Sequence, residues 1–186
     1  FAQTWVSFGP AGGQVRRMVV APSDPATVVA LPANGGLFLT TNAAATWRSI
    51  AGGICDARVN DAAFHPTLPA TIYVATASGG ICRSTDAGAS WTALSTGLPA
   101  DPNGYQLGVD IVAVNPATPT TLLAGTSTGV YRSTDGGATW TAAGVANKRV
   151  RSVVIAPSAP ATAFLLCDDG VFKSSDSGAT WTLATS

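Results

Sequence analysis

Residues 82–94 read CRSTDAGASWTAL, and this stretch decides how the rest of the chain is interpreted. Its core combines a hydroxyl, a carboxylate, a glycine and a tryptophan, which is also how some active-site loops look. The pattern recurs, however, as STDGGATW at 133–140, as SSDSGATW at 174–181 and in weaker form as TTNAAATW at 40–47. Recurrence with so little change indicates a repeated structural unit rather than one reaction site.

The segments around this turn recur as well. A strand-like run ends in proline at 15–22, 59–66, 109–116 and 150–157, and each time a second proline follows three residues later. Two more strand-like runs come next, and the tryptophan opens a short fourth one. Val, Thr and aromatic residues favour strands, while Gly and Pro mark the junctions. The unit is therefore four short strands joined by turns.

Tandem four-stranded units are typical of β-propeller blades. We expect an all-β fold, one propeller unit over residues 1–186, with four full blades at about 15–50, 59–95, 109–144 and 150–186. Thr4-Trp5 predicts one extra outer strand within 1–14. This surplus strand leaves two interpretations open: the chain is a segment of a larger propeller, or several copies assemble through uncovered strand edges.

The repeated turn has a structural explanation. Glycine takes positive φ cheaply, and a carboxylate or hydroxyl accepts N–H groups within the turn. We assign this structural role to Ser84, Asp86, Gly88 and Trp91, to Ser133, Asp135, Gly137 and Trp140, and to Ser174, Asp176, Gly178 and Trp181. Asn42 and Ala44 replace Asp and Gly in the weak copy, so a slightly different, less well-held turn is expected there. A catalytic triad would need a histidine in each copy, and His65 is the only histidine.

Blade geometry places the repeated turns and the Pro-x-x-Pro turns on one face, so function is expected in the loops of the opposite face. The second residue of each innermost strand is polar: Arg16, Asn60, Asp110 and Arg151. With Arg17 and Asp61 beside them, these residues form either a polar binding funnel near the central channel or merely its solvated lining. The long connection after Trp91 carries Tyr105, either a stacking residue for a ligand or part of a plain surface loop.

The motif S-x-D-x-G-x-T-W between strands resembles the Asp-box, or bacterial neuraminidase (BNR), repeat found in sialidases, xyloglucanases, sortilin-type receptors and photosystem II assembly factors. The flanking P-x-x-P-x-T and GG-(V/I)-(F/Y)-R-S are most similar to the xyloglucanase and assembly-factor branch, and the resemblance covers almost the whole chain. It implies a propeller of this superfamily but no single activity, because one fold hosts many functions.

The same resemblance bears on catalysis. Sialidase chemistry needs a Glu beside its Tyr nucleophile, and this chain has no Glu at all. Resemblance to xyloglucanases implies two Asp acids on the walls of a cleft between two propellers. Asp168 and Asp169, in LLCDDG, lie roughly where that family places one acid. Asp-Asp-Gly is also ordinary turn chemistry, however, and four blades cannot make two propellers.

The cysteines form an odd set of three. Cys55 and Cys82 end up on one face of the second blade, so a disulfide between them is geometrically possible. Alternatively, Cys82 simply fills the position that Phe38, Tyr131 and Phe172 occupy in the other blades. Cys167 is expected to be buried and free. The spacing does not indicate a zinc site, and neither a metal nor a cofactor is expected.

Composition excludes several functions. The net charge is zero and only 11% of residues are charged, which argues against nucleic-acid binding and a polybasic membrane patch. No apolar run reaches the ~18 residues of a membrane helix. Residues 1–14 do not read as a signal peptide, so we expect that any such peptide has been removed or never existed. A Thr/Ser-rich surface with little charge, together with a disulfide, favours an extracellular, periplasmic or cell-surface location.

We therefore expect a non-catalytic, exported β-propeller that acts as a binding or self-assembling structural module. Its partners would be other copies of itself, the rest of a larger propeller, or a protein or polysaccharide at the loop face. The alternative hypothesis is a fragment of a xyloglucanase-like glycoside hydrolase, with Asp168 or Asp169 as an acid.

Overall fold

The computed structural model describes residues 14–184 and folds them into four antiparallel sheets, each with its four strands paired in chain order. Blade 1 contains β1 (Val15–Ala21), β2 (Asp24–Pro32), β3 (Phe38–Thr40) and β4 (Arg48–Ser49). Blade 2 contains β5 (Val59–Phe64), β6 (Ile72–Thr76), β7 (Ile81–Ser84) and β8 (Thr92–Ala93). Blade 3 contains β9 (Val109–Val114), β10 (Leu122–Thr126), β11 (Gly129–Ser133) and β12 (Thr141–Ala142). Blade 4 contains β13 (Val150–Ile155), β14 (Ala163–Cys167), β15 (Gly170–Ser174) and β16 (Thr182–Leu183).

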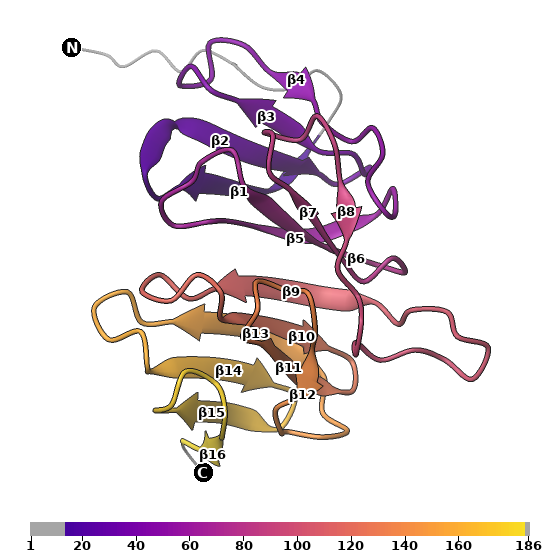
Figure 1. Ribbon diagram of the computed structural model, residues 1–186, viewed down its shortest axis with the longest axis vertical. Helices are drawn as coiled ribbons and strands as arrows, with labels where there is room; N and C mark the ends of the chain where they lie inside the picture. The colour runs from indigo at the N-terminus through magenta and orange to yellow at the C-terminus, as the bar shows by residue number, and fades with distance from the viewer. Residues whose placement is uncertain (1–13, 185–186) are drawn as a thin grey trace.

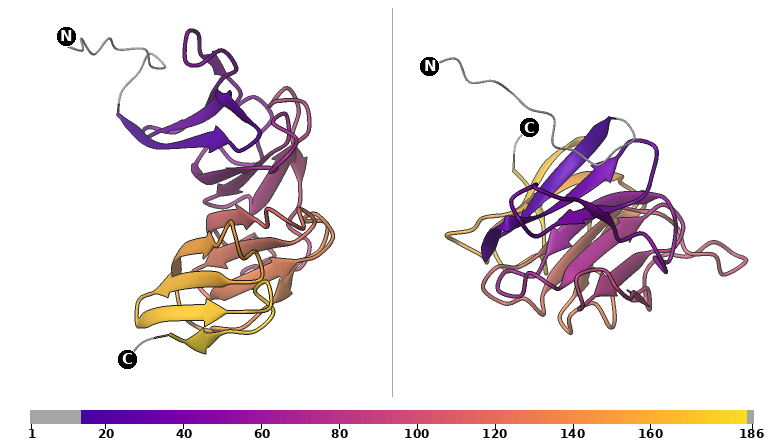
Figure 2. Two further views of the ribbon diagram at one scale, coloured as in Figure 1. Left: turned by 90° about the vertical axis from the view of Figure 1, so that its left-hand side faces the viewer. Right: turned by 90° about the horizontal axis from the view of Figure 1, so that it is seen from above.

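The prediction of an all-β fold of propeller blades is confirmed. The blades follow one another along the long axis, so that blades 1 and 4 lie at opposite ends of an open arc (Figures 1 and 2). The innermost strands β5, β9 and β13 contact one another in turn. The extra outer strand expected at Thr4-Trp5 lies outside the described residues.

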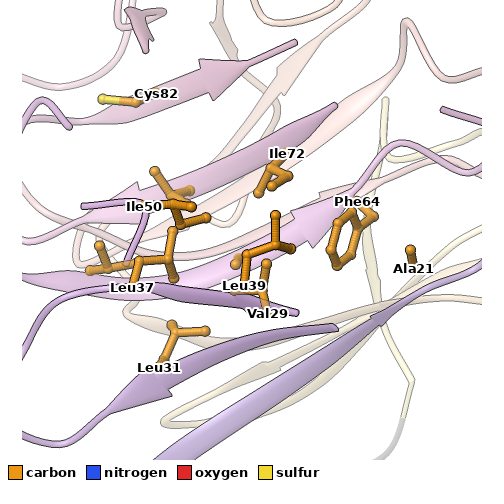
Figure 3. Packing of buried hydrophobic residues seen from close by; sticks show 12 residues of the cluster. Ala21, Val29, Leu31, Leu37, Leu39, Ile50, Phe64, Ile72 and Cys82 are labelled. Carbon is orange, nitrogen blue, oxygen red and sulfur yellow. The ribbon is translucent and has the colours of Figure 1, made fainter. Parts of the chain in front are cut away.

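The hydrophobic core lies between the blades rather than inside any one of them. Between blades 1 and 2, Val29, Leu31 and Leu37 pack with Phe64 and Ile72 (Figure 3). Two similar clusters fill the next two gaps. Because a middle blade is covered on both sides, every residue of β6 and β10 is buried, and these strands read as unbroken runs, IYVAT and LLAGT, instead of alternating.

The repeated turns are closed networks of hydrogen bonds. Asp86 accepts hydrogen bonds from the Ser84 hydroxyl (2.8 Å) and from the amide (2.9 Å) and hydroxyl of Ser90. Ser84 Oγ in turn accepts the Gly88 amide at 2.7 Å. These bonds, the one from the Ser90 hydroxyl above all, hold the pKa of Asp86 down to about 2. The turns at Asp135 and Asp176 repeat the network, and their carboxyl pKa values are lowered for the same reason.

The expectation of a different turn in the weak copy is wrong. Asn42 Oδ1 accepts the Thr40 hydroxyl and the Thr46 amide, both at 2.9 Å, just as the aspartates do elsewhere. Ala44 adopts φ +68° and Ala43 φ +53°, so the left-handed pair is kept without glycine. An amide oxygen accepts the same N–H groups as a carboxylate, and the closed network imposes the backbone conformation.

Two tryptophans join neighbouring blades. The Trp91 indole N–H donates to Ile50 O of blade 1 at 3.0 Å, and the Trp140 indole N–H donates to Leu94 O of blade 2 at 2.8 Å. The indole N–H of Trp181 is buried without a partner among residues 14–184. Each repeated turn is also tied to the Pro-x-x-Pro turn of its own blade, as by the Ala87 amide on Ala70 O, so the two kinds of turn share one face.

Candidate functional site

Four β-bulges, one in each blade, build the candidate site. In every innermost strand the pairing with the second strand skips a single residue: Arg16 in β1, Asn60 in β5, Asp110 in β9 and Arg151 in β13. An unpaired bulge residue is re-aimed relative to its neighbours. The four polar positions that the sequence placed near the channel are therefore bulge residues in the structure.

Two of these residues connect each blade to the next. Arg16 donates from Nη2 to Val59 O at 2.7 Å and to Asn60 O at 3.2 Å. Asn60 repeats the contact one blade further, from Nδ2 to Val109 O at 2.9 Å. The side chains at the first two bulges are thus held in place by backbone carbonyls, and their remaining polar atoms are available to a ligand.

The other two bulges carry ion pairs. Arg149 donates two hydrogen bonds to the Asp110 carboxylate, from Nε to Oδ2 at 2.9 Å and from Nη2 to Oδ1 at 3.2 Å. Arg151 pairs with Asp168. A polar pocket of about 250 Å³ is lined by Arg16, Asn60, Asp110, Arg149 and Arg151. With three guanidinium groups, one carboxylate and one amide, it presents directed donors to oxygen-rich groups.

A second pocket, of about 350 Å³, shares Arg16 and Asn60 with the first and extends it between blades 1 and 2. It is bounded by the turn after β2 (32–36) and the loop before β5 (57–58). We call the two pockets together the polar groove. The loop before β5, which forms part of its rim, is held in two ways. A disulfide joins Cys55 to Cys82, with Cα atoms 6.2 Å apart, and Asp56 accepts hydrogen bonds from the amide and the hydroxyl of Ser78, both at 2.7 Å. Cys167 is free and buried.

Three residues expected at the site, Arg17, Asp61 and Tyr105, do not line the groove. Asp61 is buried: its carboxylate pairs with Arg17 Nε at 2.8 Å and accepts the amides of Ala62 (2.8 Å) and Val112 (3.1 Å). Burial raises its pKa to about 6, against the opposing charge of Arg17. Asp61 therefore links blades 1, 2 and 3. Tyr105 is 74% exposed on the loop between β8 and β9, away from both pockets.

Sequence reasoning missed Arg149. This residue directly precedes β13 in the loop from blade 3 to blade 4, and Arg58 holds the same position before β5 in blade 2. The cluster Lys148-Arg149-Val150-Arg151 is the most basic stretch of the chain and was the available signal. Its three cations all pair with carboxylates, Lys148 with Asp169 and the two arginines as described above.

Asp168 and Asp169 follow β14 and are about half exposed. Each is paired with a cation, Asp168 with Arg151 and Asp169 with Lys148. The hydrogen bond from Lys148 holds the pKa of Asp169 below its usual range. A general acid must keep its proton at working pH, which requires the opposite shift. Within residues 14–184 no helix is long and apolar enough to cross a bilayer, and no three His, Cys or Asp side chains gather as metal ligands would.

Comparison with known proteins places the chain by its fold. No family model and no curated protein matches it. An ancestral GH74 enzyme is similar over all of this chain and 26% of its own, with 24% identity and a TM-score of 0.76. The GH74 enzyme of Niastella koreensis is similar over 92% of this chain and 30% of its own, with 22% identity and a TM-score of 0.73.

YCF48 bound to a D1 peptide is similar over 93% of this chain and 53% of its own, with 13% identity and a TM-score of 0.58. The chain thus spans between a quarter and about half of the proteins it resembles. At these identities the likeness is one of architecture: the blades are propeller blades of the kind found in GH74 enzymes and YCF48.

Proposed function

We propose that this chain is a non-catalytic, exported binding module that holds an oxygen-rich polymer, either a polysaccharide or a protein segment, in the polar groove. The four aligned bulges carry the proposal. A bulge interrupts the strand pairing in each blade at a residue that lines the groove, and all four of these residues are polar. The repeated turns, in contrast, satisfy their own polar groups and leave little for a ligand.

The lining defines the chemistry of the ligand. Guanidinium groups prefer carboxylate or hydroxyl oxygens, while Asp110 and the Asn60 amide can accept hydroxyl or amide hydrogens. The small pocket has almost no apolar lining beyond the methylenes of these side chains. The proteins with similar folds include both kinds of partner, since GH74 enzymes are glycoside hydrolases by their designation and YCF48 is named with a peptide bound. The Asp-box resemblance supports the same module class.

Binding at the groove can be tested by calorimetry with xyloglucan oligosaccharides, an acidic oligosaccharide and an acidic peptide. The double variant Arg149→Gln, Arg151→Gln is expected to bind the preferred ligand about tenfold or more weakly, because two charge-assisted contacts are lost. Arg48→Gln removes one positive charge from an outermost strand, outside the groove, and should leave the affinity unchanged. Equal affinity for wild type and double variant would exclude the groove as the site.

The competing hypothesis, a fragment of a xyloglucanase-like hydrolase, makes a different prediction. If Asp168 or Asp169 is an acid, the chain should release reducing ends from a β-glucan, and Asp168→Asn with Asp169→Asn should abolish the release. The pairing of both carboxylates with cations argues against this role. Hydrolysis that depends on these two residues would refute a purely binding function.

A further inference from the structure

The face of blade 4 that points away from blade 3 is apolar and exposed. On β14, Phe164 is 37% exposed and Leu166 is 47% exposed, and Val154 of β13 lies on the same face, also exposed. The equivalents of Phe164 in the other blades are Val29, Tyr73 and Leu123, each at most 3% exposed. The equivalents of Leu166 are Leu31, Ala75 and Gly125, all buried. The same positions are thus buried in every blade except the last.

These positions are buried because the next blade covers them. Val29 and Leu31 pack on blade 2, Tyr73 and Ala75 on blade 3, and Leu123 on blade 4. Phe164, Leu166 and Val154 therefore form one half of a blade-to-blade interface whose other half is not supplied by blades 1 to 3. A contiguous apolar patch of this kind is unusual unless something covers it. We call it the trailing face.

The complementary half is exposed at the other end of the same chain. On β1, Met18 is 56% exposed and Val20 is 52% exposed. Their equivalents on β5, Ala62 and Phe64, are buried against blade 1. We call the exposed surface of Met18 and Val20 the leading face. Figure 1 shows blade 1, which carries the leading face, and blade 4, which carries the trailing face, at opposite ends of the arc.

A polar contact extends the match. Arg132 of β11 donates from Nε to Ser177 O, in the repeated turn of the following blade, at 3.0 Å. Lys173 occupies the position of Arg132 in blade 4 and is exposed. Ala43 occupies the position of Ser177 in blade 1. A blade 1 placed after blade 4 would bring the carbonyl of Ala43 to the ammonium of Lys173, as in the internal interface.

We propose that the trailing face of blade 4 binds the leading face of blade 1 in a second copy of this chain, head to tail. The occupant is a second copy because the chain itself carries both halves of the contact, in the register that its three internal interfaces use. Two copies joined in this way contain eight blades, within the range of known propellers. The contact is heterologous, with two different surfaces meeting. It lies apart from the ligand groove, so either proposal can fail without the other.

Sedimentation equilibrium of the purified chain, 18.6 kDa per copy, tests the proposal with two variants. One carries Phe164→Asp and Leu166→Asp and lacks the trailing face; the other carries Met18→Asp and Val20→Asp and lacks the leading face. The wild type is expected to associate, and each variant alone is expected to remain a monomer. An equal mixture should form a complex of two chains, because each variant keeps the half that the other lost.

Three results would overturn the proposal. The first is a wild type that stays monomeric at tens of micromolar. The second is association that persists in either variant alone, which would show that like faces pair or that another surface is used. The third is a mixture that fails to associate although both variants are folded by circular dichroism. A second test avoids charge in the faces: Ala43→Cys with Lys173→Cys should be joined chain to chain by a bifunctional maleimide cross-linker on a denaturing gel, while Thr85→Cys with Lys173→Cys should not.

Discussion

The two faces of this molecule treat their polar groups in opposite ways. On the turn face, the carboxylates of Asp86, Asp135 and Asp176 accept hydrogen bonds from hydroxyls and amides of their own turns. The same bonds recur from blade to blade. On the groove face, equivalent bulge positions carry Arg, Asn, Asp and Arg: the first two donate to a carbonyl of the next blade, and the last two form ion pairs.

The difference separates scaffold from site. Residues that repeat make the same hydrogen bonds in each blade, so we assign their contribution to the stability of the fold. Residues that vary at a repeated backbone position are not required to be the same in every blade, so they can differ to serve recognition. Variants on the turn face should therefore change stability, and variants on the groove face should change binding.

The largest effect is expected for Trp140→Ala. This side chain is buried in the cluster between blades 2 and 3, and its N–H bonds to Leu94 O. Its loss should lower the free energy of unfolding by about 3–5 kcal/mol, because a large cavity forms between two blades. Urea unfolding followed by far-UV circular dichroism measures the change. Tyr105→Ala, which removes an exposed aromatic ring, should stay within about 0.5 kcal/mol of wild type; similar losses in the two variants would contradict the assignment.

A smaller loss is expected for Ser84→Ala. The Ser84 hydroxyl is buried and accepts the Gly88 amide at 2.7 Å. Without it, a buried N–H is left unpaired, which costs about 1–3 kcal/mol. The same urea titration reads this out, with the exposed neighbour substitution Thr85→Ala as control. An unchanged midpoint would mean that the hydrogen bond from the Gly88 amide to the Ser84 hydroxyl does not stabilise the turn.

The pH dependence of stability should show two opposing contributions. The pKa of Asp86 is lowered to about 2, so its contribution is present above the unfolded value near 4 and is lost as pH falls toward 2. The pKa of Asp61 is raised to about 6, so its contribution is present below pH 4 and is lost as pH rises through 6.

Asp61→Asn should therefore abolish the decline in the unfolding midpoint between pH 4 and pH 6 while leaving the acid limb below pH 4 in place. Asp101→Asn removes a carboxylate from an exposed loop and should leave both limbs unchanged. If Asp61→Asn has the same pH profile as wild type, Asp61 does not titrate as a buried group.

The smallest change in stability is expected for Arg149→Ala. Its pair with Asp110 is exposed, and such pairs contribute about 0–1 kcal/mol. Ligand affinity at the groove should nevertheless fall several-fold, because one of three guanidinium donors is removed. Thermal unfolding and calorimetry on the same preparation compare the two effects; a large loss of stability with intact binding would reverse the division between the faces.

Much of this architecture was predictable from the sequence because it is local. The turn motif and the paired prolines place the strands of each blade, and alignment of the four repeats places Arg16, Asn60, Asp110 and Arg151 at one level. That alignment did not reveal the bulges, because a bulge is a feature of the pairing between two strands and has no distinct residue pattern in a valine-rich strand. It also misjudged Ala44, whose positive φ depends on the hydrogen bonds of the closed turn rather than on its own preference.

The features that the sequence did not predict depend on contacts between residues far apart in the chain. Asp61 is the third residue of β5 and Asp110 is the second residue of β9, so the two hold adjacent positions in the aligned repeats. Asp61 is nevertheless buried and accepts the amide of Val112, while Asp110 lines the groove and pairs with Arg149. The sequence by itself determined four repeated blades and their turns, because short-range turn chemistry and strand propensity act within a few residues. Only the tertiary structure decided which polar groups meet a partner and which apolar faces stay uncovered, because those outcomes depend on the blade that packs next.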